Sequence, residues 1–588
     1  MKTFKQIIRE AENKIAGIAA APGIVIAKTY LFTKEAIEIN EEVIYEVEVA
    51  KANLDEALRK SKKELTKVLN IAREKMSGTR AAIFEAQVMI LDDPILISTI
   101  KKRIEKEKKL PEFIVNDEIS KYQQMMILSH EPYMKERAHD IEDIKNRIIR
   151  NLQKKRWQSK ILNDAIVVSD SLTPADTILL SRCNVKGFVT DHGGLTSHAA
   201  IISRSLNIPA VVGTHSGTKL IKDGETIIID GFHGYVFTNP SEEQLKFYTL
   251  KQEKLIELQR GLEELRTLPA KTKDGKEINL KANVDVSGEI DLVVTSGAKG
   301  IGLYRTEQIL EELGEFPSED EQAAIYTRLA SRIYPEHITI RAFDIGGDKF
   351  KFLDYTEPNP FLGLRGIRIL LENTTLFKTQ VRAVLRASQN KNIQFMLPMI
   401  TTLKEIKMAK ELIEECKREL KRDKVIFDSR MKIGIMIEVP SAAVMAKELA
   451  QEIDFISIGT NDLIQFLMAV DRGNDLVAQL FQEFNPAVIR TIAHIVREAK
   501  KAHREVSICG EMAADTLAMP LLVGLGLDSL SMSPATLPYA KRIIRSMSYQ
   551  KAKELADECL EAGSEKEITD KIEKFFKEHS IIRTRQII

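Results

Sequence analysis

The stretch GGLTSHAAIISRSLNIPAVVG, residues 193–213, places a loop, a helix and a strand in immediate succession. The two glycines at its start let the backbone turn sharply or approach a ligand closely. Thr196 and Ser197 are residue types that favour the N-cap of a helix, and the apolar residues after them are spaced as on one helical face. The pattern predicts a helix that begins at His198 and is followed by a short strand.

His198 is the residue of this stretch that could carry chemistry. At the start of a helix, an imidazole lies beside backbone N–H groups that have no helical partner and beside the positive end of the helix dipole. A phosphoryl group is stabilised there, so one interpretation is a phosphohistidine. The other is an exposed histidine in a capping loop, the commoner arrangement for one histidine among ten. Spacing alone leaves both interpretations open.

Length and composition limit the classes of protein to consider. A chain of 588 residues predicts about three to five domains at roughly 100 to 200 residues each. Its 86 basic and 85 acidic residues argue against nucleic acid or an anionic membrane as a partner. The four cysteines show no CxxC spacing, which favours reduced thiols. With no secretory signal and no apolar run near the ~20 residues that span a bilayer, we expect a soluble, cytoplasmic protein.

β-rich segments lie on both sides of a long charged stretch. Short β-rich runs, separated by helical pieces in the later segment, predict α/β structure in residues 15–36 and 153–240, after a polar leader at 1–14. Between these two segments, residues 37–152 are charged, with apolar positions every three or four residues. This spacing predicts an inserted antiparallel helical bundle. Judged by fold alone, the bundle could equally be structural or bind a partner.

The C-terminal half predicts a second architecture. Residues 241–269 read as a helical linker with prolines at both ends, which makes hinges plausible. Residues 270–588 alternate strands with helices, which predicts a (β/α)8 TIM barrel with its active site at the C-terminal ends of the strands. The eight candidate strands are INLKANVD, GIGLYRTE, ITIRAFDI, IQFMLPMI, KIGIMIEVP, FISIGTND, VSICGE and LDSLSMS. The predicted fold class is therefore a multidomain α/β protein.

Polar residues stand at the ends of these candidate strands, and a chance distribution would scatter them along the strands. They are Arg305, Glu307, Arg341, Asp344, Glu438, Asn461, Asp462, Cys509 and Glu511. Planar guanidinium groups suit a substrate with a phosphate and a carboxylate, because each binds two oxygens. The candidates are Arg305, Arg341 and Arg472, with Arg365 as a fourth. The competing interpretation of a lone arginine in such a loop is a surface ion pair.

Two carboxylates and one cysteine complete the candidate site. Glu438 and Asp462 end neighbouring strands, and two oxygen ligands together with substrate oxygens make a good Mg²⁺ site. A structural salt bridge is the competing account of these two residues. Cys509 ends the seventh strand. A buried cysteine is most often an inert small hydrophobe, since reactivity needs an accessible, perturbed thiol.

Residues 193–213 resemble the phosphohistidine signature of the phosphoenolpyruvate-utilising enzymes, a family that includes pyruvate phosphate dikinase, phosphoenolpyruvate synthase and Enzyme I of the sugar phosphotransferase system. The motifs GIGLYRTE, RAFDIGGDK, NPFLGLRGIR, GTNDLIQFLMAVDRGND and SICGEMA resemble Enzyme I motifs in order and spacing. This resemblance runs from about Ile15 to the C-terminus. It also implies that residues 15–36 and 153–240 form one phosphohistidine α/β domain, and that this domain swivels. The barrel is further expected to form a homodimer, and the helical insertion to dock the phosphocarrier protein HPr.

The resemblance implies a role for each candidate residue. His198 would take the phosphoryl group of phosphoenolpyruvate on Nε2, and Cys509 would protonate the departing enolate to give pyruvate. The family's metal ligands fall on Glu438 and Asp462, with Mg²⁺ as the cofactor. Its substrate contacts fall on Arg305, Arg341, Asn461, Asp462 and Arg472. The phosphoryl group would then pass to a histidine of HPr, the first step of sugar phosphotransfer.

Two alternatives accompany this expectation. A dikinase or synthase needs a further nucleotide-binding domain, and the sequence has neither room for one nor a G-x-x-x-x-G-K-[ST] loop. A non-catalytic phosphorelay protein could sense phosphoenolpyruvate with a degenerate barrel. A sensor would need the arginines but neither the acid nor both metal ligands, so the intact set of residues counts against it.

Overall fold

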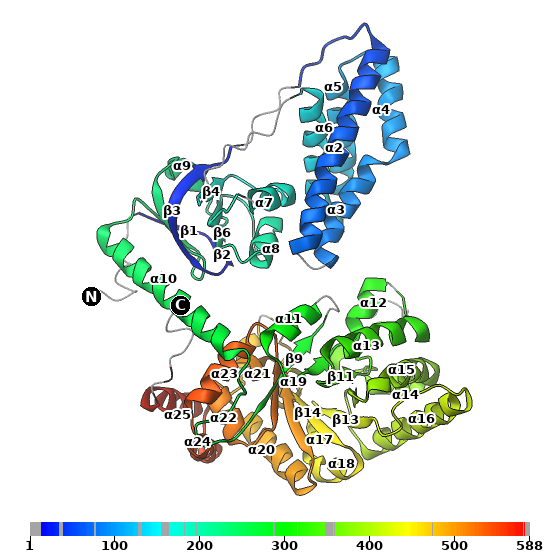
Figure 1. The fold of residues 1–588 in the computed structure, drawn as a ribbon, viewed down its shortest axis with the longest axis vertical. Helices are drawn as coiled ribbons and strands as arrows, with labels where there is room; N and C mark the ends of the chain where they lie inside the picture. Colours follow the sequence, from blue (N-terminus) through cyan, green and yellow to red (C-terminus); the bar gives the residue numbers. More distant parts are fainter. Residues whose placement is uncertain are drawn as a thin grey trace. The chain divides into compact units, whose positions relative to one another are not determined.

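The computed structural model describes residues 13–581 except for residues 34–38, 76–77, 128–131, 155–163, 182, 196, 286–288, 314, 347–356, 358, 473, 475 and 580. The chain forms two compact units that meet in sequence between Ile256 and Glu257 (Figure 1). Most of the expected leader at 1–14 lies outside the described residues. In the described part of the chain, no helix is both long enough and apolar enough to cross a membrane.

The first unit contains an eight-stranded sheet in the order β1-β8-β7-β3-β4-β5-β6-β2. Its central strands β3 to β6 run parallel, and the outer pairs are antiparallel. Apolar residues fill β4, β5 and β6, as expected for parallel strands that are covered on both faces. The strands are β1 (Lys14–Ala16), β2 (Ile18–Ala21), β3 (Ile24–Leu31), β4 (Ile166–Ser169), β5 (Gly187–Thr190), β6 (Ala210–Val212), β7 (Thr226–Asp230) and β8 (Tyr235–Thr238).

A helical insertion follows β3 and packs against the helices of the sheet domain. Ala175 and Ile178 of α7 and Ile202 of α8 belong to the same buried cluster as the apolar residues of the insertion. This shared core joins the insertion to the helix that begins at His198. The helices are α2 (Val47–Lys75), α3 (Gly78–Leu91), α4 (Pro94–Glu107), α5 (Pro111–Ile127), α6 (Pro132–Leu152), α7 (Pro174–Ser181), α8 (His198–Ser205) and α9 (Gly217–Leu220).

Helix α10 (Glu242–Leu265) occupies most of the expected linker. Near its start, the hydroxyl of Tyr248 donates to the buried carboxylate of Asp230 at 3.2 Å. After its end, the carbonyl of Arg266 accepts a hydrogen bond from Lys541 Nζ at 2.6 Å. Both ends of the helix are therefore tied by buried or partly buried polar contacts.

The second unit is a closed barrel of eight parallel strands, as the sequence predicts. Closure comes from the pairing of β16 with β9, in which Leu530 lies opposite Leu280. Apolar residues from every strand enter one large core that continues under the outer helices. The strands are β9 (Asn279–Val284), β10 (Ile301–Tyr304), β11 (Ile338–Arg341), β12 (Ile393–Leu397), β13 (Lys432–Ile437), β14 (Phe455–Gly459), β15 (Glu505–Cys509) and β16 (Ser529–Met532).

Helices cover the barrel from outside (Figure 1). Side chains close in sequence can fix where such a helix begins. Helix α16, for example, begins with a capping box in which Thr402 and Glu405 satisfy each other's backbone N–H groups. The helices are α11 (Ile290–Ser296), α12 (Glu307–Leu313), α13 (Glu319–Ile333), α14 (Ile367–Glu372), α15 (Thr374–Ala387), α16 (Leu403–Arg422), α17 (Pro440–Val444), α18 (Ala446–Glu452), α19 (Thr460–Met468), α20 (Pro486–Lys501), α21 (Glu511–Ala514), α22 (Met519–Gly524), α23 (Leu537–Ser546), α24 (Tyr549–Glu561) and α25 (Glu565–Glu578).

Candidate functional site

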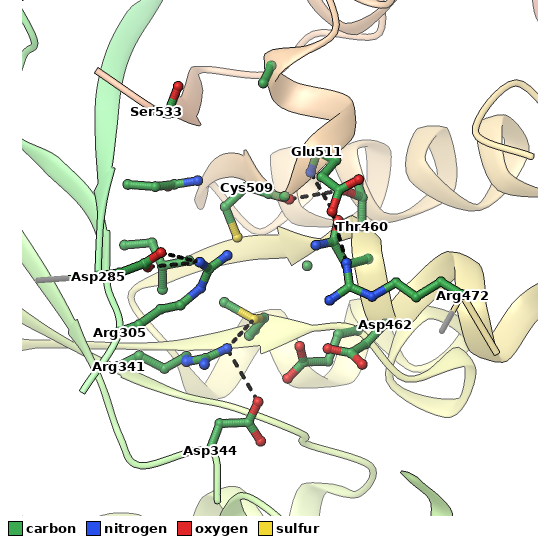
Figure 2. A pocket seen from close by; sticks show the side chains of 18 of the residues that line it. Asp285, Arg305, Arg341, Asp344, Thr460, Asp462, Arg472, Cys509, Glu511 and Ser533 are labelled. Carbon is green, nitrogen blue, oxygen red and sulfur yellow. Dashed lines mark hydrogen bonds and ion pairs between the residues drawn. The ribbon is translucent and has the colours of Figure 1, made fainter. Parts of the chain in front are cut away.

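A cavity of about 650 Å³ opens at the C-terminal ends of the barrel strands (Figure 2). All the barrel residues singled out from the sequence for substrate, metal or acid roles line it. They are Arg305, Arg341, Arg365, Glu438, Asn461, Asp462, Arg472 and Cys509. They end or follow five of the barrel strands, β10, β11, β13, β14 and β15, so barrel closure brings together residues that are far apart in sequence. Their individual roles remain predictions.

Arg305 and Arg341 face the cavity from neighbouring strands (Figure 2). Arg305 follows β10, and its Nη1 lies 2.8 and 3.0 Å from the two carboxylate oxygens of Asp285. Arg341 ends β11 and is buried, with its Nη2 3.0 Å from Glu307 Oε2 and its Nη1 3.4 Å from Asp344 Oδ2. Although burial opposes its charge, these two carboxylates raise the pKa of Arg341 above its usual value. Both cations are therefore held ready for an anionic ligand.

Two further arginines complete the cationic lining. Arg365 lies with its Nη2 3.0 Å from Asp344 Oδ2 and its Nη1 3.3 Å from Asp462 Oδ1. Arg472 lies 3.0 Å from Glu511, whose backbone N–H donates to Asn461 Oδ1 at 2.9 Å. Four guanidinium groups thus line one cavity, each beside at least one carboxylate. This arrangement suits a small substrate that carries several negative charges.

Glu438 is the most buried carboxylate of the cavity, with 1% of its surface exposed. Its Oε1 accepts the Met399 N–H at 2.6 Å, and its Oε2 points to Gly459, where a Cβ would lie only 2.9 Å away. Burial raises the pKa of Glu438 to about 8, and the charges of Asp462 and Asp344 act in the same direction. A bound cation would relieve this repulsion.

The donor set fits a metal that also takes ligands from substrate. Within the described ranges, no group of three or more His, Cys, Asp or Glu side chains could hold a metal ion without help. Two carboxylates, Glu438 and Asp462, line the same cavity. Mg²⁺ commonly keeps only one or two protein carboxylates and completes its octahedron with water and phosphate oxygens. The residues present are compatible with that ion.

Cys509 ends β15 and is 2% exposed, yet it lines the cavity. Its Sγ accepts a hydrogen bond from Ser457 Oγ at 3.4 Å and donates to the Ile458 carbonyl at 3.6 Å. Burial raises the pKa of the Cys509 thiol, and the hydrogen bond from Ser457 partly opposes that change. At neutral pH this group is a protonated thiol beside the arginines, as a general acid must be.

The loop before α8 is held by its own side chains. Ser197 is the N-cap of α8, and its Oγ accepts the Ala200 N–H at 3.3 Å. Arg204 donates to the carbonyl of Leu195 at 2.6 Å and to that of Ala20 at 2.9 Å. Gly193 adopts a φ of +126°, a conformation that favours glycine. A helix therefore begins at His198, as predicted, while Thr196 and the imidazole itself lie outside what the structure describes.

Matches to protein-family models cover most of the chain. Residues 16–137 match "PEP-utilising enzyme, N-terminal", residues 161–234 match "PEP-utilising enzyme, mobile domain", and residues 259–549 match "PEP-utilising enzyme, PEP-binding domain". The cavity described above falls within the last of these.

Proteins named phosphoenolpyruvate-protein phosphotransferase align with nearly all of the chain. Those of Staphylococcus carnosus and Bacillus subtilis are each 39% identical to it over 96% of its length, covering 99% and 100% of their own. That of Geobacillus stearothermophilus is 40% identical over the same share and is covered to 98%. This chain belongs to the phosphoenolpyruvate-protein phosphotransferase family. A solution structure of Enzyme I shares 38% identity with a TM-score of 0.38, over 41% of this chain and 99% of that one.

Membership in the phosphoenolpyruvate-protein phosphotransferase family confirms the resemblance seen in the sequence, and the closed barrel and the α/β sheet confirm the fold class. Other cavity residues received no role from the sequence, among them Asp285 and Ser533. Each directly follows a barrel strand, so the rule that picked out the other polar residues would have found them. The domain boundaries drawn from the sequence remain predictions.

Proposed function

We propose that this protein transfers the phosphoryl group of phosphoenolpyruvate to His198, releases pyruvate, and passes the group to a histidine of a phosphocarrier protein of the HPr type. The observation that carries the proposal is the identity of 39–40% with phosphoenolpyruvate-protein phosphotransferases over 96% of the chain. The cavity supports it, because a doubly anionic substrate needs several guanidinium groups around one space.

Substrate binding uses the cations of the cavity. Arg305, Arg341 and Arg472 receive the phosphate and carboxylate oxygens, with Asn461 and Arg365 as further polar contacts. Glu438 and Asp462 would hold Mg²⁺, which when bound neutralises charge on the phosphoryl oxygens. The acidic partners of the arginines keep the guanidinium groups oriented before substrate arrives.

Phosphoryl transfer then breaks one bond and forms another. A neutral imidazole nitrogen of His198, Nε2 by family resemblance, attacks phosphorus as the P–O bond to the enolate oxygen breaks. The enolate takes a proton from the Cys509 thiol at its methylene carbon and becomes pyruvate. Formation of the ketone makes the step favourable, so no nucleotide is required. The thiolate recovers its proton from solvent.

The second half of the reaction needs an acceptor protein. We assign its docking to the helical insertion, α2 to α6, which shares a buried core with α7 and α8. This core gives a direct mechanical link between a docked carrier and the helix that begins at His198. Homodimer formation through the barrel belongs to the same proposal.

The test is incubation of the protein with phosphoenolpyruvate that carries a labelled phosphoryl group, in the presence of Mg²⁺ and the absence of nucleotide. We expect label on the wild type, none on His198→Ala, and near wild-type label on the control His215→Ala, a histidine on the neighbouring loop. Label retained by His198→Ala would move the nucleophile elsewhere. In a parallel incubation with labelled ATP in place of phosphoenolpyruvate, label on the protein would favour a dikinase-type enzyme; no label from either donor would favour a sensor.

A further inference from the structure

A buried hydroxyl lies beside the proposed acid. Ser457 is on β14, the strand next to β15, and is 1% exposed. Its Oγ donates to Cys509 Sγ at 3.4 Å, across 52 residues of sequence. Directly after β14, at the start of α19, Thr460 Oγ1 donates to the Cys509 carbonyl at 3.1 Å. One hydroxyl fixes the sulfur, and the other fixes the backbone that carries it.

Apart from the charges of Arg305, Arg341 and Glu438, which act on the sulfur through space, its remaining surroundings are apolar. Cys509 belongs to a small buried cluster with Leu303, Met396, Met436 and Phe455. A neutral thiol is stable among apolar side chains, but a thiolate loses its hydration there and needs hydrogen-bond donors in exchange. The backbone carbonyl of Ile458 accepts from the thiol and so can only stabilise the protonated form. Among the described residues, Ser457 supplies the hydrogen bond that the sulfur accepts.

We propose that Ser457 is a positioning residue for the proton-transfer step: its hydroxyl orients the Cys509 thiol and stabilises the thiolate that forms when the proton leaves. This inference rests on the proposed function, in which Cys509 is the acid. In the step, the S–H bond breaks and its electron pair stays on sulfur. The π electrons of the enolate form the new C–H bond, and solvent later returns a proton to the thiolate.

The test follows this step through exchange of the methyl hydrogens of pyruvate. The full-length protein is incubated with phosphoenolpyruvate, pyruvate and Mg²⁺ in ²H₂O, and NMR follows loss of the methyl signal. Ser457→Ala is expected to slow exchange about tenfold, since hydrogen bonds to charged groups exceed the value of ordinary ones. The phosphoenolpyruvate concentration for half-maximal rate should stay within about twofold of wild type. Ser457→Thr keeps the hydroxyl and should retain at least about half of the rate.

A matched control lies one strand away. Ser507 is paired in register with Ser457, and its hydroxyl donates to the Ile456 carbonyl at 3.2 Å rather than to the sulfur. Ser507→Ala is expected to exchange like wild type. Equal rates for Ser457→Ala and Ser507→Ala, or failure of Ser457→Thr to restore the rate in a folded protein, would overturn the role of Ser457 alone. Absence of exchange in the wild type would overturn the proton-transfer part of the proposed function and this inference with it.

Discussion

At the scale of single residues, each arginine of the cavity is paired with at least one carboxylate before any substrate arrives. Glu307 illustrates this. Its Oε2 pairs with Arg341 at 3.0 Å, while its Oε1 accepts the backbone N–H of Asp344 at 2.6 Å. One buried carboxylate thus orients a proposed substrate contact and the loop that carries a second acid. Removing the charge of Glu307 leaves the buried guanidinium group of Arg341 with less charge compensation.

Glu307→Gln is therefore expected to lower kcat/KM for phosphoenolpyruvate at least about tenfold, because the amide either faces Arg341 with a donor or gives up the Asp344 N–H. The measurement is pyruvate release coupled to a phosphocarrier acceptor. Glu505→Gln is the matched control, since Glu505 pairs with Lys281 at 3.1 Å and begins β15 at the end remote from the cavity. Equal kcat/KM values for the two variants would contradict the role of Glu307.

Glu483 gives a prediction on pH. Burial raises the pKa of Glu483 to about 7, with Asp515 and Glu511 acting in the same direction. The folded state therefore binds more protons than the unfolded state between pH of about 4.5 and 7, and the free energy of unfolding falls as pH rises through that window. Above this pH window, the destabilisation caused by the buried Glu483 carboxylate stays constant. Below the window, the carboxyl group is protonated in both the folded and the unfolded state, so the destabilisation disappears.

Glu483→Gln should accordingly stabilise the barrel at pH 8 by about 1 to 2 kcal/mol, a figure reduced to allow for partial solvent screening, and have little effect near pH 4. The measurement is the urea concentration at the midpoint of barrel unfolding, taken for both proteins across that range. A stabilisation independent of pH would show that packing, and not the titration of Glu483, is responsible.

At the scale of elements, the start of α8 is decided by one cap. The hydroxyl of Ser197 satisfies the Ala200 N–H, which otherwise has no helical partner. Ser216 stands at the same N-cap position of α9, but it makes no side-chain cap hydrogen bond. Ser197 accepts from its helix, whereas the Ser216 hydroxyl donates to the Thr214 carbonyl at 3.4 Å, so Ser216 serves as a control without a cap.

Ser197→Ala is expected to cost about 1 kcal/mol of local stability in α8, because capping side chains are worth that much. Hydrogen exchange at the Ala200 amide should become about fivefold faster. Ser216→Ala should leave the amides of α9 unchanged. If both variants behave alike, the cap is not what holds the first turn after His198 in place.

The segment after α10 is attached to the barrel through α23. Lys541 is 3% exposed and donates to the carbonyls of Arg266 and Gly297 at 2.6 and 3.3 Å. One turn further on, Arg545 donates to the Pro269 carbonyl at 2.8 Å. Burial lowers the pKa of Lys541, with Lys299 and Arg545 adding to the effect. The ammonium group of Lys541 holds this segment through the hydrogen bonds that it donates to the two carbonyls.

Lys541→Met should lower the stability of the barrel by about 1 to 3 kcal/mol, since two carbonyls lose a donor that the thioether cannot replace. Chemical denaturation monitored on the barrel transition measures this. The control is Lys553→Met on the exposed face of α24, which should change stability by less than about 0.5 kcal/mol. Similar losses in both variants would mean that α23 does not hold this segment through Lys541.

At the scale of the whole molecule, the two units have separate cores. The large barrel cluster contains residues from Ala270 to Ile581, while the buried clusters of the first unit end at Tyr248. Because each unit has a hydrophobic core of its own, we expect each to unfold as a cooperative unit.

Calorimetry of the full-length protein should show separable unfolding transitions. Pyruvate with Mg²⁺, at about 100 times the dissociation constant, should stabilise only the barrel transition, by roughly 2.7 kcal/mol, because the proposed ligand cavity belongs to that unit. Arg341→Ala, measured in parallel, should lose this response. A single transition, or a ligand shift in the first unit as well, would contradict independent cores or the placement of the ligand.

Local sequence was sufficient to predict the helices and strands and many residues of the candidate site. The alternation of strands and helices predicts a barrel, since hydrophobic periodicity depends on near neighbours. Thr196 and Ser197 predict where α8 begins for the same reason. Residues at strand ends could be named as a set, because the C-terminal ends of barrel strands meet at one face whatever the details of packing. Asp285 and Ser533, which obey the same rule, could have been included.

The sequence by itself thus determined the family, the α/β and barrel architecture, and the residues that gather at the barrel mouth. Tertiary structure decided which partners they take: Arg365 with Asp462, 97 positions away, and Ser457 with Cys509, 52 positions away. Such pairs depend on strand register and barrel closure. Short-range patterns carry no information about either, because helical and strand periodicities link a residue only to those a few positions along the chain.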